Sequence, residues 1–332
     1  MQTVCKNILE TVGKTPLVKL NSEKWGIACS ILAKLEFFNP TGSVKDRIAL
    51  SMIQAAERDG LLRPGDGGLI VEPTSGNTGA GIAMVAASKG YAVLFVVQDK
   101  VSREKQALLN AFGAEVVVVP AKIPRREPGG LYYEAQRIAK ERGGVMLDQY
   151  YNPANRMAHY STTGPELFAQ SGGQIDALVV CMGTCGTISG TGGFLKERIP
   201  RVKVIGVEPE GSIFRGGEFK SYLVEAIGSD FIPGNLDSSV VDEIVGVGDA
   251  DAFKTARLLA KREGIFAGGS SGAALFGALQ AAKKYGEGSV IATIFPDSGF
   301  RYLSKFYDDE WLAKNGLEKS ENKAGCLLNL VS

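Results

Sequence analysis

The sequence has little histidine, no ordered set of cysteines and no long apolar run. Its 332 residues include one histidine, His159, and five scattered cysteines. A single imidazole argues against serine–histidine triads and histidine-bound metals, because those mechanisms need imidazole beside a nucleophile or a metal ion. Cys181 and Cys185 have no second cysteine pair nearby, and the odd cysteine number is typical of reduced thiols. We therefore expect neither a metal site nor a disulfide framework.

Charge and hydropathy give no sign of a nucleic-acid or membrane partner. Lysine and arginine number 37 against 36 aspartate and glutamate, so no overall field attracts nucleic acid or an anionic membrane. Residues 1–25 lack the basic-then-apolar pattern of a signal peptide, and no apolar run approaches the roughly 18 residues of a membrane span. We expect a cytoplasmic protein that binds neither nucleic acid nor membrane.

The sequence does contain a regular alternation of apolar runs and helical patterns. Since a domain typically contains roughly 150 residues, the length of the chain predicts two domains. Short runs rich in β-branched residues predict strands at 93–97, 116–119, 177–181, 202–207 and 290–295. Stretches with small apolar faces predict helices at 78–89, 105–112, 132–142, 252–262 and 273–285, and residues 121–130 predict an exposed loop. Together they predict an α/β fold with sheets covered on both faces.

A lysine stands where a glycine turn meets an expected helix. Residues 39–47 read NPTGSVKDR, and a helical pattern continues over 48–58. Near a helix N-terminus the dipole disfavours a cation, so the amine of Lys45 has a reason to act as a neutral nucleophile or to form an imine. Taken alone, the stretch would equally suit a solvated surface lysine.

Glycine- and hydroxyl-rich turns follow several expected strands. EPTSGNTG at 72–79 is suited to carboxylate or phosphate capture, and GTCGT at 183–187 to a phosphate cradle. GGSSG at 268–272 offers a hydroxyl for an uncharged ring nitrogen, and PDSG at 296–299 can close the same pocket. Helix capping would explain each turn alone, and the first turn lacks the GxGxxG pattern of dinucleotide binding. Open α/β sheets bind ligands at such strand ends.

In this order, NPTGSVKDR, EPTSGNTG, GTCGT, GGSSG and PDSG resemble the cysteine synthase and cystathionine β-synthase family. Its members are pyridoxal-phosphate (PLP) enzymes of fold type II, like the tryptophan synthase β-subunit. The resemblance runs from Asn7 to about Leu317 and implies two lobes, each with a mostly parallel sheet flanked by helices. Residues 1–40 and 156–317 would form a large cofactor-binding domain, 41–155 a smaller mobile domain, and 318–332 a C-terminal tail.

The resemblance also implies a role for each motif. Lys45 would be the catalytic lysine that forms the internal aldimine with pyridoxal 5′-phosphate, Asn77 would contact the ring oxygen, and Ser270 would face the pyridine nitrogen. The cofactor phosphate would be held by the second turn: Gly183, Thr184, Cys185, Gly186 and Thr187. The amino-acid substrate would be bound by Thr74, Ser75, Gly76, Thr78, Gln149 and Gly228.

The implied activity is β-replacement on an O-activated serine, O-acetylserine or O-phosphoserine, with sulfide, giving L-cysteine. A serine hydroxyl at the ring nitrogen leaves the ring a weaker electron sink than a carboxylate would, which suits elimination at the β-carbon. Lys45 would supply the general base. Cystathionine synthesis from homocysteine and β-replacement with an amine, giving a diaminopropionate-type product, remain alternatives. A silent binding homologue is least favoured, because Lys45, Asn77 and Ser270 are intact.

Three departures from the family pattern bear on detail. Cys185 stands where the phosphate loop usually repeats glycine, and Ala226 replaces the first glycine of a Gly-Ile-Gly loop that faces the substrate amine. An added methyl there can change the choice of nucleophile. Ser229 stands where cystathionine β-synthases tend to carry tyrosine, and we expect neither a C-terminal regulatory module nor an N-terminal haem segment. The family is usually homodimeric, and a serine acetyltransferase is a further partner that the resemblance leaves open.

Overall fold

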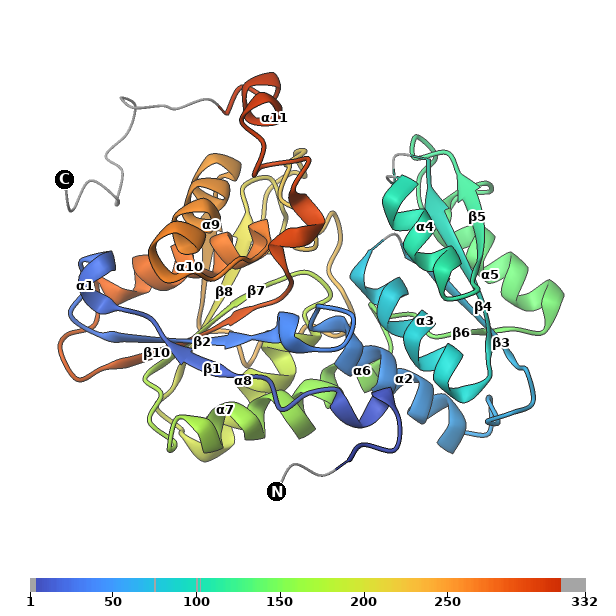
Figure 1. Ribbon diagram of the computed structural model, residues 1–332, viewed down its shortest axis with the longest axis horizontal. Coiled ribbons are helices and arrows are strands. Elements are labelled where there is room, and N and C mark those ends of the chain that lie inside the picture. Colours follow the sequence, from blue (N-terminus) through green and yellow to red (C-terminus); the bar gives the residue numbers. More distant parts are fainter. Residues whose placement is uncertain (1–3, 75, 100, 102, 318–332) are drawn as a thin grey trace. The chain divides into compact units, whose positions relative to one another are not determined.

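The chain folds into two compact units, each with its own sheet and core. The computed structural model describes residues 4–74, 76–99, 101 and 103–317, apart from the side chains of 103–105. One unit comprises Met1–Lys14 and Asn39–His159, and the other Thr15–Phe38 and Tyr160–Ser332 (Figure 1). The boundaries of a smaller mobile domain and a large cofactor-binding domain stay a prediction, and the expected tail at 318–332 lies outside the described residues.

The first unit contains a four-stranded parallel sheet in the order β5-β4-β3-β6. A helix follows each strand, so the carboxyl ends of all four strands meet at one edge of the sheet. The strands are β3 (Leu69–Pro73), β4 (Ala92–Gln98), β5 (Glu115–Val119) and β6 (Val145–Met146). The helices are η1 (Ile8–Thr11), α2 (Lys45–Arg58), α3 (Asn77–Lys89), α4 (Arg103–Ala111), α5 (Leu131–Arg142) and α6 (Pro153–Ala158).

Both faces of this sheet are buried, because successive side chains of a strand point to opposite faces. Ile70 and Phe95 pack with α2, α3 and α4 on one face. Val71 and Leu94 pack with α5 on the other face, and Figure 1 shows α4 and α5 on opposite sides of the sheet. This double cover explains why the strands read as continuous apolar runs.

The second unit contains a six-stranded sheet in the order β1-β2-β10-β7-β8-β9. All neighbours are parallel except β1, which pairs antiparallel with β2. The strands are β1 (Leu17–Lys19), β2 (Ser30–Leu35), β7 (Ala177–Cys181), β8 (Lys203–Pro209), β9 (Glu243–Val247) and β10 (Val290–Phe295). The helices are α1 (Ser22–Trp25), η2 (Glu36–Phe38), α7 (Gly164–Gln170), α8 (Gly186–Arg198), α9 (Asp249–Glu263), α10 (Gly269–Ala282), η4 (Gly299–Tyr302) and α11 (Asp309–Lys314). A π-helical turn, η3 (His159–Thr163), begins at the last residue of the first unit.

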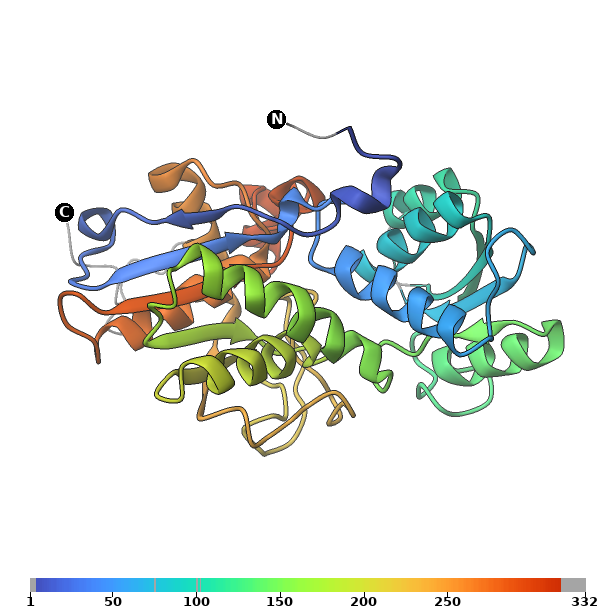
Figure 2. The ribbon, with the colours of Figure 1, turned by 90° about the horizontal axis from the view of Figure 1, so that it is seen from below.

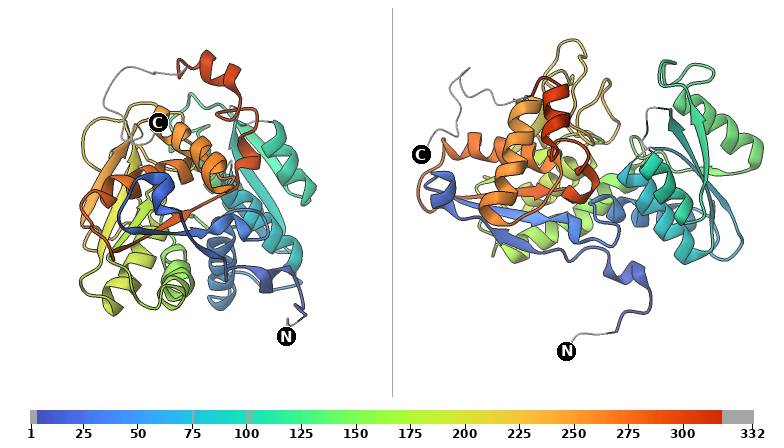
Figure 3. Two further views of the ribbon diagram at one scale, coloured as in Figure 1. Left: turned by 60° about the vertical axis from the view of Figure 1, so that its left-hand side comes forward. Right: turned by 45° about the horizontal axis from the view of Figure 1, so that its top comes forward.

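Helices also cover both faces of the second sheet. Val179 and Cys181 of β7 belong to the core formed with α9 and α10, and these two helices pack against each other (Figure 3). Leu178 and Val180 belong to the opposite core, which α7 and α8 cover (Figure 2). The second unit therefore places the turns after β7 and β8 at the carboxyl edge of a sheet that is buried on both faces.

These elements confirm the predicted α/β class. The predicted strands 177–181 and 290–295 coincide with β7 and β10, and the other three differ by one or two residues at their ends. Helices α9 and α10 begin three and four residues earlier than predicted, because their polar or glycine-rich starts are already helical. Residues 121–130 form turns, as expected. Within the residues that the structure describes, no helix combines the length and hydropathy needed to cross a membrane.

Candidate functional site

Lys45 is the first residue of α2, where the motif analysis expects a lysine at a helix start. No described side chain caps this N-terminus, and the Lys45 N–H instead donates to Ser43 Oγ at 3.2 Å. The half-buried lysine thus lies at the positive end of the helix dipole, which favours the neutral form of an amine.

A close contact between two helices brings Lys45 beside the start of α3. A β-carbon added to Gly81 would lie 3.1 Å from the Lys45 carbonyl oxygen and 3.1 Å from the Ala49 β-carbon. Asn77, the residue predicted to contact the cofactor ring, opens α3 one turn before Gly81. The small residue at position 81 therefore allows the N-terminal turns of α2 and α3 to pack against each other.

Asp46 holds the turn that precedes Lys45, and the motif analysis gives it no role. Its buried carboxylate accepts the Thr41 N–H at 2.7 Å and the Thr41 hydroxyl. The sequence pattern that could have pointed to Asp46 is an acidic residue in the first turn of an expected helix whose N-cap position, Val44, has no capping side chain. We conclude that Asp46 fixes the loop that delivers Lys45.

The predicted substrate residues of the first unit gather around the start of α3. Thr74, Thr78 and Gln149 are all buried, and the Thr78 hydroxyl donates to Gln149 Oε1 at 2.7 Å. Gly76 is the N-cap of α3, and no side chain among the described residues caps that N-terminus. The structure thus places four of the predicted substrate residues in one unit, while Ser75 lies outside the described residues.

The predicted phosphate cradle opens α8 in the second unit. Cys185 is the N-cap residue in the left-handed conformation, at φ +63°, and no described side chain caps the helix. Burial raises the pKa of the Cys185 thiol to about 12, so the thiol stays neutral. The backbone N–H groups of the first turn therefore form the part of this loop that suits an anion.

The predicted substrate loop at 226–228 lies against this cradle. A β-carbon on Gly183 would sit 3.0 Å from the Ala226 carbonyl oxygen, and the Gly228 N–H donates to the Met182 carbonyl at 2.7 Å. Ala226 has φ +69°, a left-handed conformation that favours glycine. The sequence departure at position 226 thus places a β-carbon on a strained backbone next to the phosphate loop.

Ser270 is the second residue of α10 and is 1% exposed. Its hydroxyl finds no hydrogen-bond partner among the described residues, while its carbonyl accepts from Cys181 Sγ at 3.2 Å. The GGSSG and PDSG turns pack together, because the Gly268 N–H donates to the Asp297 carbonyl at 3.0 Å. A β-carbon on Gly268 would clash with Asp297 Oδ1 at 2.0 Å, so only glycine fits there.

Two of these features fit the cofactor that the motifs imply. A buried hydroxyl without a partner costs about 1–3 kcal/mol, so Ser270 is suited to a ligand that brings a polar atom, such as a ring nitrogen. An uncapped helix N-terminus preceded by a glycine-rich loop is suited to a phosphate, as α8 is. The described residues contain no group of three or more histidine, cysteine or acidic side chains arranged to hold a metal ion.

The motif analysis also missed a device that occurs once in each unit. Strands β3 and β8 both end in Glu-Pro, and the glutamates, Glu72 and Glu208, are fully buried. Each carboxylate accepts two consecutive backbone N–H groups of a loop, at 148–149 for Glu72 and at 214–215 for Glu208. The sequence signal is the repeated Glu-Pro pair at a strand end.

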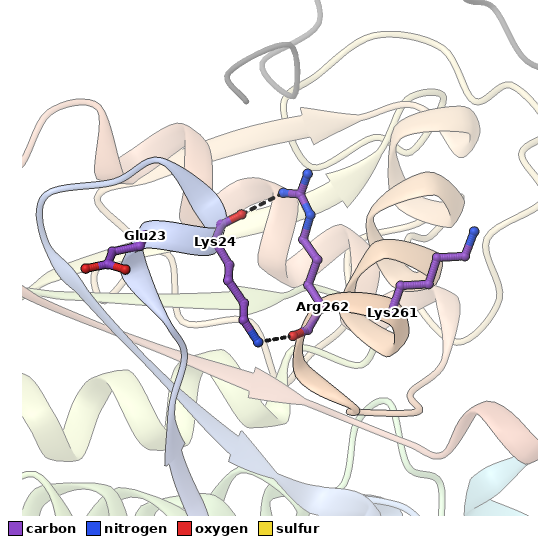
Figure 4. A pocket seen from close by; sticks show the side chains of 4 residues that line it. All are labelled: Glu23, Lys24, Lys261 and Arg262. Atoms are coloured by element: carbon purple, nitrogen blue, oxygen red, sulfur yellow. Dashed lines mark hydrogen bonds between the residues drawn. The ribbon is translucent and has the colours of Figure 1, made fainter. Parts of the chain in front are cut away.

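A shallow pocket lies apart from all of these motifs, at the C-terminal ends of α1 and α9 in the second unit. Its lining consists of Glu23, Lys24, Lys261 and Arg262 (Figure 4). Lys24 Nζ donates to the Arg262 carbonyl at 2.6 Å, and Arg262 Nη1 donates to the Lys24 carbonyl at 2.8 Å. These reciprocal hydrogen bonds join the ends of two helices, so Lys24 and Arg262 have a structural role here and we assign the pocket no ligand.

The comparison with known proteins agrees with the motifs. The model of the family described as pyridoxal-phosphate dependent enzyme matches residues 8–297. Rat cystathionine β-synthase is 46% identical over 327 residues, covering 96% of this chain and 58% of its own. A Staphylococcus aureus cysteine synthase is 45% identical over 300 residues, covering 90% of this chain and 95% of its own.

Two solved structures are similar over almost the whole chain. O-ureido-L-serine synthase has a TM-score of 0.86 at 40% identity and covers 94% of this chain and 100% of its own. The Helicobacter pylori O-acetylserine dependent cystathionine β-synthase has a TM-score of 0.84 at 38% identity, with coverage of 92% and 99%.

The family model and the similarity to these solved structures show a PLP enzyme of fold type II. The chain belongs to the pyridoxal-phosphate dependent enzyme family, and its relatives include proteins named cysteine synthase and cystathionine β-synthase. The predicted family, fold class and cofactor are thereby confirmed. The chain spans only about 58% of the length of the rat relative.

Proposed function

We propose that the protein catalyses β-replacement on an O-activated serine, either O-acetylserine or O-phosphoserine, with sulfide as the nucleophile. The reaction exchanges the ester oxygen at the β-carbon for sulfur and releases acetate or phosphate together with L-cysteine. The observation that carries the proposal is the buried hydroxyl of Ser270, which has no hydrogen-bond partner among the residues that the structure describes. A hydroxyl at the ring nitrogen, unlike a carboxylate, does not hold a proton there, and a weaker electron sink favours β-elimination over deeper carbanion chemistry.

In this proposal the residues of the second unit hold the cofactor. The first-turn N–H groups of α8, with Gly183, Thr184, Cys185, Gly186 and Thr187, bind the phosphate. The Ser270 hydroxyl would donate a hydrogen bond to the ring nitrogen, and the Asn77 side-chain N–H group would donate one to the ring oxygen. When bound, the cofactor withdraws electrons from the α-carbon of the amino acid, so that the α-proton and then the β-substituent can leave.

The residues of the first unit handle the substrate. Thr74, Ser75, Gly76, Thr78 and Gln149 bind the α-carboxylate through hydroxyl, amide and backbone donors, while Gly228 of the second unit belongs to the loop at the substrate amine. Lys45 holds the cofactor and then takes the α-proton on its freed amine. Its place at the N-terminus of α2 favours the neutral form of that amine, which is the form that can accept a proton.

Cystathionine synthesis from homocysteine is the second candidate. It is favoured by the 46% identity to the rat enzyme and by the likeness to a Helicobacter pylori protein described as an O-acetylserine dependent cystathionine β-synthase. Another similar structure is named O-ureido-L-serine synthase, which indicates a product other than cysteine for that protein. β-Replacement with an amine, giving a diaminopropionate-type product, therefore stays the third candidate. Ala226 is the residue we expect to influence this choice, since its methyl group lies on the loop that faces the substrate amine.

We further propose that residues 41–155 form a mobile domain that closes on the substrate, and that the protein is a cytoplasmic homodimer. A serine acetyltransferase is the macromolecular partner that this activity would suit. Light scattering of the purified protein would test the dimer, and co-purification with such an acetyltransferase would test the partner.

The test of the proposed function combines spectroscopy with product analysis. Purified protein with added PLP should absorb in the visible range, and O-acetylserine or O-phosphoserine should change that band. Sulfide, homocysteine and an amine offered in competition should give mainly cysteine. Lys45→Ala should abolish turnover and the native absorption band, whereas Lys140→Ala, a change of an exposed lysine on α5, should leave both intact. Full activity in Lys45→Ala would refute the assigned mechanism.

A further inference from the structure

Glu72 is the penultimate residue of β3, and its side chain is fully buried. Its two carboxylate oxygens accept different backbone N–H groups: Oε2 that of Asp148 at 2.8 Å and Oε1 that of Gln149 at 3.1 Å. Within the described residues, Glu72 forms no ion pair with a lysine or arginine. Burying a carboxylate that no cation neutralises costs free energy. The hydrogen bonds from the backbone N–H groups of this turn offset that cost.

The turn that Glu72 holds has a backbone that needs holding. Asp148 has φ +52°, in the left-handed region that non-glycine residues adopt at a cost of about 1 kcal/mol. The hydroxyl of the buried Tyr132 donates to Asp148 Oδ1 at 3.0 Å, and Asn155 Nδ2 donates to the Gln149 carbonyl at 2.6 Å. Contacts from β3, α5 and α6 therefore fix a conformation that the local sequence would not adopt alone.

The turn carries a side chain of the proposed carboxylate site. Gln149 Oε1 accepts the Thr78 hydroxyl at 2.7 Å, and this orientation makes Nε2 the donor end of the amide. The chain of contacts runs from Glu72 through the backbone of Gln149 to Thr78, which follows Glu72 by only six residues. Glu72 lies near the end of β3 and Thr78 near the start of α3. The Glu72 carboxylate and the Thr78 hydroxyl therefore hold the same glutamine, one through its backbone N–H and one through its side chain.

We propose that Glu72 is a positioning residue for the substrate carboxylate, acting through the 148–149 turn to set the place and orientation of the Gln149 amide. The inference deepens the proposed function and rests on it, because it takes Gln149 and Thr78 as ligands of the substrate carboxylate. Glu72 itself touches neither substrate nor cofactor in this proposal. Its loss is expected to weaken amino-acid binding while the chemistry at the α-carbon continues.

The protonation of Glu72 gives this role a pH dependence. Burial raises the pKa of Glu72 to about 8, against the lowering effect of the N–H groups of Leu147, Asp148 and Gln149. The titratable groups that face it are Asp148, which also raises this pKa, and the neutral phenol of Tyr132, whose own pKa is raised by burial. Ionised acceptors form stronger hydrogen bonds than neutral ones, so the turn is held more firmly as the pH rises through about 8.

The main experiment compares the wild-type holoenzyme with Glu72→Gln, in which an amide NH₂ group would oppose one of the two backbone donors. Steady-state kinetics with O-acetylserine and sulfide, from about pH 6.5 to about pH 9.5, should show a KM raised about tenfold and a kcat within about twofold. The wild-type KM divided by the KM of Glu72→Gln at the same pH should fall as the pH rises through about 8. Cofactor content and the visible spectrum without substrate should be unchanged.

A second readout does not depend on turnover. L-Alanine, which has no leaving group, should be titrated into each protein while the cofactor absorbance is followed, and its dissociation constant should also rise about tenfold in Glu72→Gln. Tyr132→Phe loosens the same turn from its other side and should raise KM about threefold, which keeps the proposal testable if Glu72→Gln folds poorly.

Asp176→Asn is the matched control. Asp176 accepts the Val290 N–H at 2.9 Å at the amino-terminal edge of the second sheet, so the variant replaces a carboxylate acceptor with a weaker amide acceptor for a backbone N–H group away from the substrate residues. It should lower stability while leaving KM and its pH profile at wild-type values. If Asp176→Asn raised KM as much as Glu72→Gln, the effect would be general loosening and the inference would fail.

The two proposals fail in distinguishable ways. If the wild type turns over O-acetylserine and both Glu72→Gln and Tyr132→Phe keep its KM, the positioning role alone is overturned. Weakened L-alanine binding in Glu72→Gln, in a protein that turns over no serine ester, would support the positioning role and overturn the reaction. A wild-type holoenzyme that binds no amino acid would overturn both.

Discussion

The carbonyl oxygen of Lys45 lies 3.1 Å from the point where a β-carbon on Gly81 would sit, so the catalytic lysine of our proposal depends on a missing side chain one helix away. Asp46 Oδ1 and the Ala49 β-carbon lie at the same distance from that point. We predict that Gly81→Val forces α2 and α3 apart and lowers the free energy of unfolding by about 1–3 kcal/mol, as overpacking commonly does. Urea denaturation of the cofactor-free protein would measure this loss.

The same variant should bind PLP more weakly, because the N-terminal turns that carry Lys45 and Asn77 would no longer pack in their native arrangement. Gly286→Val is the control, since no described atom lies within 4 Å of a β-carbon placed there. Wild-type stability and cofactor affinity in Gly81→Val would show that the two helices tolerate a wider spacing, contrary to our argument.

Ser270 supports a prediction in which the cofactor-free and cofactor-bound proteins respond in opposite directions. Its hydroxyl is buried with no partner among the described residues, so Ser270→Ala removes an unsatisfied polar group. The free energy of unfolding of the cofactor-free protein should stay equal or rise by up to about 1 kcal/mol. The extra stability gained on adding PLP should fall by about 1 kcal/mol, the usual net contribution of one hydrogen bond.

Thermal unfolding with and without saturating PLP would measure both changes, and Ser271→Ala serves as the comparison. Ser271 is the neighbouring buried serine whose hydroxyl likewise lacks a partner in the described part of the chain, but we assign it no contact with the cofactor. Equal losses of PLP-dependent stability in the two variants would mean that Ser270 does not face the ring nitrogen. A related variant, Ser270→Asp, should move the absorption band and slow β-replacement.

Ala226 holds a left-handed backbone without being glycine, at φ +69°. The left-handed region costs a residue with a β-carbon about 1–2 kcal/mol, and glycine loses roughly 0.5–1 kcal/mol of that advantage through unfolded-state entropy. Ala226→Gly should therefore raise the free energy of unfolding by up to about 1 kcal/mol. The ratio of products from sulfide and homocysteine should change in the same variant, because the loop at the substrate amine becomes more flexible.

The matched substitution is Ala121→Gly, at a half-buried turn residue outside the left-handed set, where glycine should only destabilise. A decrease in stability of Ala226→Gly as large as that of Ala121→Gly would show that the strain at position 226 is relieved elsewhere. An unchanged product ratio would remove Ala226 from the account of nucleophile choice.

The strands and the motif-bearing helices could be predicted from the sequence because their signals are local. Residues 177–181 and 290–295 are buried on both faces and therefore appear as unbroken apolar runs. The lysine of NPTGSVKDR stands at the start of α2, as its glycine turn indicates. Motif order then led to the family, which the comparisons confirm.

The features that the sequence could not reveal depend on contacts between distant segments. Glu72 pairs with N–H groups 76 and 77 residues away, and nothing in the EPTSGNTG motif distinguishes a buried carboxylate from an exposed one. Gly81 lies in a helix pattern where its need to be small becomes visible only when α2 packs on it. The positive φ of Ala226 likewise has no signal in the sequence, because alanine is not a residue that favours the left-handed region.

The pKa of Glu72 predicts how stability changes with pH. Burial raises this pKa from its ordinary value of 4.5 to about 8, so between these values the folded protein keeps a proton that the unfolded chain releases. Stability then falls as the pH rises. The contribution of Glu72 to the free energy of unfolding is fully present below about pH 4.5 and is lost as the pH rises through about 8.

The glutamine of Glu72→Gln does not titrate, so its contribution to stability does not change with pH. From about pH 4.5 to about pH 8 the wild type should therefore lose free energy of unfolding relative to the variant. Urea denaturation of the cofactor-free proteins at about pH 5, 7 and 9 would measure the difference, with Asp176→Asn as a variant that keeps Glu72. A wild-type advantage that grows from pH 5 to pH 9 would mean that the backbone N–H groups outweigh burial and that Glu72 is ionised throughout. The substrate-binding turn would in that case be held equally firmly at every pH, and the KM of the wild type should not follow the ionisation of this residue.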